Sequence, residues 1–267
     1  MKQIFFLAGF PRSGNTLLSS ILNQNPSIST TAHSILPDIF HKINELKYTS
    51  IFKNFPDETS LDNVMSGVFN NYYDNWPTDI IVDRGDWITP YNINLLKQNY
   101  PNFKIIILVR DILDIIKSYL KLCNHYSNYE YNVIYNQTDK TTLYTNREET
   151  LCDLIMQKGH YIDTVLYSIK YLIETNQKNI KFVEYKSLVN DTKNTLKSIY
   201  SFYNLKYFKH DLNNLKQYSV NNLSYNDDIH YAPLHTIRTD KIVEDNNIEL
   251  PEKTINKYSN LEIWRNE

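Results

Sequence analysis

The chain has 267 residues, and its 28 lysines and arginines nearly balance its 30 aspartates and glutamates, giving a formal net charge of −2. This length suits one large α/β domain, and the balanced charge offers no basic surface for nucleic acid or for an anionic membrane. No apolar stretch approaches the roughly 18 residues that a membrane span requires, so the sequence predicts no such span.

Strands and helices alternate along the chain. Short, continuous apolar runs at residues 4–10, 79–83, 104–109 and 180–185 are typical of strands in a parallel sheet that is covered on both faces. Helical periodicity predicts helices at residues 16–25, 61–75, 91–100, 112–124, 150–174 and 192–203. This alternation predicts one α/β domain over residues 1–267, with its functional groups at the carboxyl ends of the strands.

Two regions fit this alternation poorly, namely residues 33–76 and residues 124–150. The second region is polar, rich in tyrosine and longer than an ordinary connection between a strand and a helix. We expect these regions to be insertions that act as a lid or that bind an acceptor molecule.

The first strand runs into the sequence GFPRSGNT, which is a phosphate-binding P-loop with one altered position. A nucleoside triphosphatase carries lysine where this chain has Asn15, because that lysine reaches the β and γ phosphates. The positive charge instead lies on Arg12, and the backbone N–H groups where the helix begins still face an anion. The loop favours a P-loop NTPase-like fold with about four or five parallel strands, although a tight strand-to-helix turn of purely structural origin can also contain glycine and serine.

Arg110 and Ser118 form a second candidate anion site at the end of the third predicted strand. Arg110 leaves the strand, and Ser118 lies about two helical turns further on, so both side chains can reach one phosphate. The structural alternative pairs Arg110 with Asp111 or Asp114 and assigns no role to Ser118.

These two motifs resemble those of the sulfotransferases that use 3′-phosphoadenosine 5′-phosphosulfate (PAPS). FPRSGNTLL is similar to the family's 5′-phosphosulfate loop, and LVRDILDIIKSYLK to its 3′-phosphate motif, with PRSG closest to tyrosylprotein and bacterial sulfotransferases. Further likeness in ILNQNP, VDRGDWIT, VEYKSLVNDTKNTLKSIYSFYNL and PLHTIRTDKI extends the resemblance from residue 4 to residue 241. The resemblance implies transfer of a sulfuryl group from PAPS to a hydroxyl, or an amine, of an acceptor, with 3′,5′-ADP as product and no metal ion. The acceptor class, whether carbohydrate, lipid, small molecule or peptide, is left open.

The resemblance also implies roles for particular side chains. The phosphosulfate ligands are Arg12, Ser13, Gly14, Asn15 and Thr16, the 3′-phosphate ligands are Arg110 and Ser118, and Tyr185 touches the nucleotide. Arg84, in DRGDW, lies near the position of a family lysine that contacts the sulfate and the leaving oxygen. His235 and Arg238 correspond to a C-terminal loop over the 3′-phosphate.

A general base is needed to remove the proton of the acceptor. His33 matches, through the NP motif, the position of a catalytic glutamate in tyrosylprotein sulfotransferases, and a neutral histidine can accept a proton at pH 7. Asp86 is the alternative base.

Two other functions compete with sulfotransfer. An ATP-dependent phosphotransferase is disfavoured by Asn15 and by the weak set of acidic magnesium ligands, of which Asp111 is the sole candidate. The other alternative is a degenerate nucleotide-binding module that has no catalytic activity. Cys123 and Cys152 lack metal or disulfide spacing, so we expect reduced, buried thiols in a cytoplasmic protein.

Overall fold

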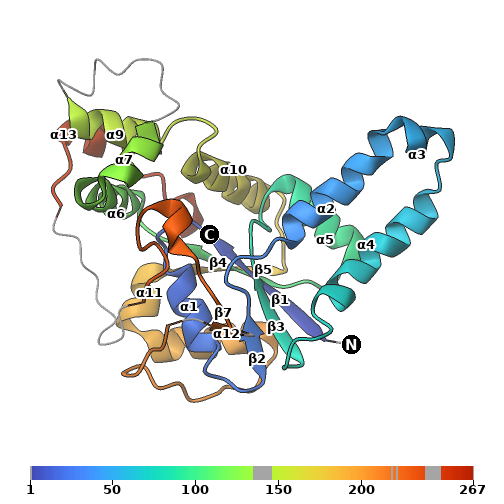
Figure 1. The fold of residues 1–267 in the computed structure, drawn as a ribbon. Helices are drawn as coiled ribbons and strands as arrows, with labels where there is room; N and C mark the ends of the chain where they lie inside the picture. The colour runs from blue at the N-terminus through green and yellow to red at the C-terminus, as the bar shows by residue number, and fades with distance from the viewer. Residues whose placement is uncertain (1, 135–145, 218, 221, 238–247, 267) are drawn as a thin grey trace.

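The computed structural model describes residues 2–134, 146–217, 219–220, 222–237 and 248–266. Its centre is a five-stranded, fully parallel sheet in the order β2-β3-β1-β4-β5 (Figure 1). The strands are β1 (Gln3–Gly9), β2 (Ile28–Thr30), β3 (Ile80–Arg84), β4 (Ile105–Val109) and β5 (Ile180–Glu184). The predicted α/β fold is confirmed, and β2 is an additional edge strand whose three residues are too few to show a pattern in the sequence.

Helices cover both faces of the sheet because apolar side chains of β1 alternate between them. Phe5 and Leu7 pack with α1 (Asn15–Leu22) and α12 (Thr192–Tyr203) in one core cluster, beside the short α11 (Tyr185–Asn190). Phe6 and Ala8 belong to the cluster on the other face, formed with α4 (Glu58–Tyr72), α5 (Pro90–Asn99), α6 (Ile112–His125) and α10 (Tyr161–Glu174). β1 is therefore buried on both faces, as a central parallel strand requires.

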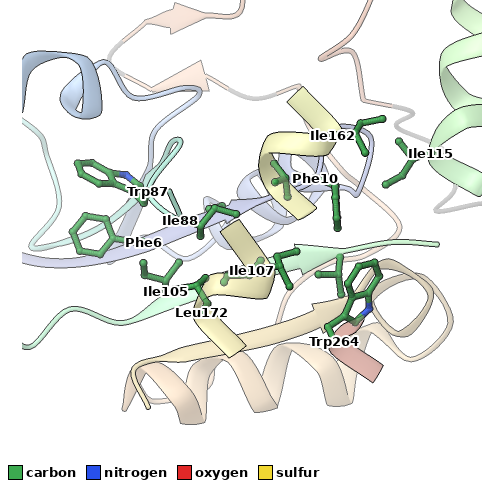
Figure 2. Close-up of a cluster of buried hydrophobic side chains, with 14 of the residues drawn as sticks. Phe6, Phe10, Trp87, Ile88, Ile105, Ile107, Ile115, Ile162, Leu172 and Trp264 are labelled. Atoms are coloured by element: carbon green, nitrogen blue, oxygen red, sulfur yellow. The ribbon is translucent and has the colours of Figure 1, made fainter. Parts of the chain in front are cut away.

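The second cluster anchors the start of the P-loop (Figure 2). Phe6 and Trp87 are fully buried and meet edge to face, with ring centroids 5.0 Å apart. Phe10, the second residue of the loop, packs against Trp264 near the C-terminus, with ring centroids 5.3 Å apart. Such aromatic pairs add about 0.5–1.5 kcal/mol to the burial of their area. Aromatic packing therefore fixes both β1 and the beginning of the loop against the core.

Two predicted segments differ from the structure. The helix expected at 150–174 is two helices, α9 (Arg147–Ile155) and α10, separated by a turn in which Gly159 has φ of +80°, a conformation that suits glycine. The region 33–76 is helical, with α2 (Leu36–Glu45), α3 (Ser50–Asn54) and α4 extending away from the sheet (Figure 1).

The expected insertion at 124–150 is described only at its two ends. α7 (Ser127–Ile134) packs against α6 and α9, and residues 135–145 lie outside the described residues. The C-terminal part adds the strands β6 (Ser219–Val220) and β7 (Leu223–Ser224), the short 3₁₀ helices η2 (Asp227–His230) and η3 (Ile263–Asn266), and α13 (Glu252–Tyr258). Within the described ranges, no helix is both long and apolar enough to cross a bilayer.

Candidate functional site

The carboxyl ends of all five strands meet at one edge of the sheet and bring the predicted residues together. Across the sheet, from β2 to β5, the residues at or beyond the strand ends are His33, Arg84, Arg12, Arg110 and Tyr185. This is the edge at which ligands bind in open parallel sheets.

The P-loop is held in shape by its own side chains. The buried Ser13 hydroxyl donates to the carbonyl of Phe10 at 2.6 Å, and the Asn15 side-chain amide donates to the same carbonyl at 2.8 Å. Asn15 therefore turns into the loop, where a Walker lysine would turn toward phosphates. Gly14 is the N-cap of α1 and provides no side-chain cap, so the N–H groups of the first turn stay available to an anion.

Arg110, Tyr185 and Gly14 form one packed unit beside the loop. Arg110 is 8% exposed, and its guanidinium donates to the carbonyl of Arg12 at 2.8 Å and lies 4.4 Å from the centre of the Tyr185 ring. A Cβ on Gly14 would stand only 2.8 Å from that ring, and Gly14 has φ of +88°. Glycine is thus required where the Tyr185 ring crosses the loop.

Arg12 bridges the loop to two other elements. Its Nε donates to the hydroxyl of Ser118 on α6 at 3.1 Å, and its Nη1 donates to the carbonyl of Leu234 at 2.9 Å. Arg12, Arg110 and Ser118, which were chosen from separate sequence motifs, are therefore linked by hydrogen bonds. Three of the donors expected to hold phosphate groups lie in one connected arrangement.

Arg84 and its neighbours form the other half of the site. Arg84 Nη1 donates to the carbonyl of Ala32 at 2.8 Å and to the hydroxyl of Thr16 at 3.3 Å. The hydroxyl of Tyr225 contacts both Arg84 Nη1 and the Ala32 carbonyl. Sequence reasoning missed Tyr225, because it belongs to no motif and the chain contains 22 tyrosines.

His33 follows the carboxyl end of β2, and Asp86 follows that of β3, two residues after Arg84. The His33 side chain keeps access to solvent, but the surrounding protein and the Arg84 cation lower its pKa, while Asp86 and Asp38 oppose that shift. A lowered pKa keeps the imidazole neutral at pH 7, the form that accepts a proton. Asp86 receives a hydrogen bond from the hydroxyl of Tyr161.

Asp83, which sequence reasoning did not select, anchors the turn that carries His33. Its fully buried carboxylate accepts hydrogen bonds from Ser34 Oγ at 2.9 Å, from Trp87 Nε1 at 2.8 Å and from the hydroxyl of Tyr73. Burial raises the pKa of Asp83 to about 6, although the three donors favour the charged form. The bond to Ser34 ties the residue after His33 to the end of β3.

His235 also reaches the site, whereas Arg238 lies outside the described residues. His235 Nδ1 lies 2.6 Å from Asp227 Oδ1, and its ring stacks on Tyr225 with centroids 3.9 Å apart. Burial lowers the pKa of His235 to about 4, despite the hydrogen bond with Asp227.

A cavity of about 500 Å³ opens onto the P-loop and the three arginines Arg12, Arg84 and Arg110, whereas His33 and Asp86 are not among its lining residues. Its lining includes the P-loop, all three arginines, Ser118, Tyr185 and residues 233–237. The volume lies within the usual range for sites that enclose small ligands. In the part of the chain that is described, no group of three or more histidine, cysteine, aspartate or glutamate side chains could hold a metal ion. Asp111 caps α6 by accepting the backbone N–H groups of Leu113 and Asp114.

Comparisons with known proteins identify the family and the fold. The chain matches the family model described as a sulfotransferase domain over residues 2–247. A Caenorhabditis briggsae protein named "Putative protein-tyrosine sulfotransferase" is 26% identical over 129 residues, which is 45% of this chain and 44% of that protein. The match thus spans less than half of this curated relative, so its activity as a whole protein does not transfer directly.

Two solved structures share the fold. A sulfotransferase domain from the curacin biosynthetic pathway has a TM-score of 0.57 at 15% identity, with 96% of both chains covered. The sulfotransferase domain of a Synechococcus olefin synthase has a TM-score of 0.53 at 15% identity, covering 96% of this chain and 94% of that chain. At these identities the likeness concerns the fold.

Proposed function

The chain belongs to the sulfotransferase domain family, and on that premise we propose that it transfers the sulfuryl group of PAPS to a hydroxyl or an amine of an acceptor. The observation that carries the proposal is the convergence of Arg12, Arg84 and Arg110 on a P-loop whose Asn15 amide turns inward. A phosphosulfate carries less charge than a triphosphate, and a planar guanidinium contacts its oxygens through a fork of donors.

In the proposed reaction, the acceptor oxygen forms a bond to sulfur while the bond from sulfur to the bridging oxygen breaks. 3′,5′-ADP leaves with the negative charge that develops on the bridging oxygen. Arg12 and Arg84 are the groups assigned to that charge, because fixed donors aimed at a developing charge lower the barrier. Arg110 and Ser118 are assigned to the 3′-phosphate.

The acceptor must lose a proton as its oxygen attacks. We assign this step to His33, whose neutral ring lies beside Arg84, and keep Asp86 as the alternative. The contact of Asp86 with the Tyr161 hydroxyl favours His33, because one oxygen of the Asp86 carboxylate is already occupied by that hydrogen bond.

Cys123 and Cys152 are free, buried thiols, which supports our prediction of a cytoplasmic location. The competing phosphotransferase reading is weakened by Asp111, whose carboxylate is engaged at the N-terminus of α6.

Ligand-induced stabilisation tests the proposal against its alternatives. Thermal unfolding is measured with 3′,5′-ADP, with ATP plus magnesium, and without ligand. A ligand at one hundred times its dissociation constant stabilises the fold by about 2.7 kcal/mol, so 3′,5′-ADP should raise the melting temperature by several degrees. Stabilisation by ATP plus magnesium alone would support the phosphotransferase.

Turnover completes the test. A screen of hydroxyl and amine acceptors with sulfur-labelled PAPS should yield labelled product, and EDTA should leave the rate unchanged. Binding of 3′,5′-ADP without transfer to any acceptor would favour the non-catalytic module. Loss of turnover on chelation, with recovery on adding magnesium, would contradict the proposed mechanism.

A further inference from the structure

A segment far along the chain reaches the sulfuryl end of the proposed site. About half of residues 223–237 are exposed, whereas Tyr225, Asp227 and His235 are among those that are partly buried. The Tyr225 hydroxyl contacts Nη1 of Arg84, which lies 141 positions earlier in the chain. The same hydroxyl contacts the carbonyl of Ala32, the residue before His33. This segment therefore touches the boundary between the P-loop and the proposed base.

The position of the Tyr225 ring is fixed by its own segment. The His235 ring lies parallel to it, with an interplanar angle of 2° and centroids 3.9 Å apart. Asp227 holds His235 twice, at the backbone N–H at 2.9 Å and at Nδ1 at 2.6 Å. The Gln217 side chain adds a bond to the carbonyl of His235 at 3.0 Å and one from the N–H of Ile237 at 3.0 Å.

We propose that Tyr225 is a positioning residue for sulfuryl transfer, which holds the Arg84 guanidinium against Thr16 while Asp227 and His235 hold the Tyr225 ring. This inference rests on the proposed function. A free arginine side chain samples many rotamers, so a donor that must meet a developing charge gains from contacts that confine it. Burial raises the pKa of Tyr225, so its hydroxyl stays neutral and leaves proton abstraction to another group.

The same geometry gives His235 a role different from that implied by the family resemblance. Asp227 is an acceptor, so the neutral His235 ring donates its proton from Nδ1, and Nε2 is left as an acceptor. A neutral ring in this tautomer has no second N–H to donate to an ionised phosphate. His235 therefore acts as a clamp on Tyr225 and not as a ligand of the 3′-phosphate.

Tyr225→Phe tests the positioning role, with Tyr231→Phe as the matched control, since Tyr231 is an exposed tyrosine of the same segment. Release of 3′,5′-ADP from PAPS should slow by roughly 10- to 100-fold in the first variant, the scale expected for a misplaced catalytic group. The dissociation constant of 3′,5′-ADP and the melting temperature should match those of the control. An unchanged rate would overturn the proposal.

A double-mutant cycle asks whether Tyr225 acts through Arg84. In an Arg84→Lys background, Tyr225→Phe should cause little further loss, because the group it positions is already gone. If the rate loss of the double variant instead equals the product of the losses in the two single variants, the positioning role is overturned.

Two variants of His235 separate a clamp from a ligand. His235→Phe keeps an aromatic ring on Tyr225 and should retain more turnover than His235→Ala, and both should bind 3′,5′-ADP as the wild type does. Equal weakening of 3′,5′-ADP by both would instead make His235 a ligand.

One measurement stays informative if the proposed function fails. The side-chain Nε–H NMR signal of Arg84, assigned from its absence in Arg84→Lys, should shift or broaden in Tyr225→Phe but not in Tyr231→Phe. If the wild type fails to bind 3′,5′-ADP, the proposed function is lost while this signal still reports the contact. An unchanged signal in Tyr225→Phe refutes the contact itself.

Discussion

Replacing Arg110 by alanine should weaken the binding of 3′,5′-ADP more than the binding of 5′-AMP, because the two ligands differ only in the 3′-phosphate. Arg110 is buried and already oriented by the Arg12 carbonyl at 2.8 Å and the Tyr185 ring at 4.4 Å, so it binds a phosphate with little loss of side-chain entropy. A charge-assisted hydrogen bond contributes about 1.5–3 kcal/mol, which corresponds to roughly 10- to 150-fold in affinity.

The variant also disturbs the loop, since Arg110 supports the Arg12 carbonyl, but this disturbance weakens 3′,5′-ADP and 5′-AMP alike. The ratio of their dissociation constants, measured by titration calorimetry, therefore isolates the 3′-phosphate contact. We expect that ratio to change by roughly 10- to 150-fold in Arg110→Ala. It should stay constant in Lys197→Ala, which removes an equal charge from the exposed face of α12. Equal weakening of both ligands in Arg110→Ala would refute the assignment and make Arg110 a structural support.

Three further predictions concern the loop, the base and the buried carboxylate. Gly14→Ala should lower the free energy of unfolding by about 1–3 kcal/mol in urea titrations, because φ is +88° and Tyr185 blocks a Cβ; unchanged stability would contradict this packing. His33→Ala should slow turnover by roughly 10²- to 10⁴-fold at unchanged 3′,5′-ADP affinity. Since the pKa of His33 is lowered, the wild-type rate should decline only below a pH of about 6.5. A His33→Ala variant with a normal rate and the same loss of rate at low pH would make Asp86 the general base. Asp83 has a pKa of about 6 when folded, above the roughly 3.9 of the free side chain, so the folded state keeps a proton between these values that the unfolded state loses. Stability should therefore decline by about 2–3 kcal/mol as the pH rises from about 4 to 6, and Asp83→Asn should remove that decline; an equal decline in the variant would show that other groups cause it.

Local sequence was sufficient for the features whose cause is local. The apolar runs predicted four of the five strands, because strands covered on both faces are nearly continuous apolar runs. The loop from Gly9 to Thr16 was recognisable because its glycines and short polar side chains serve the turn itself. Arg110 and Ser118 were found together because helical spacing relates them directly.

Local sequence also misled in places where a turn breaks a regular pattern. The run from 150 to 174 has helical periodicity throughout, yet Gly159 in a left-handed conformation divides it. The three residues of β2 carry no period of their own and are a strand because β3 pairs with them. Pairing partners decide such elements, and they lie far away in the chain.

Only the tertiary structure decided which side chains are neighbours across the strand ends. The order β2-β3-β1-β4-β5 sets Arg84 between His33 and the P-loop, and no property of residues 28–33 or 80–84 specifies that order. Tyr225 was likewise missed because its partners, Arg84 and Ala32, lie far from it in the chain. Asp83 was missed because no local pattern links it to Trp87, Tyr73 and Ser34, which lie 4, 10 and 49 positions away. Hydrogen bonds and burial between distant residues form only after the sheet has assembled, so their chemistry leaves no local pattern in the sequence.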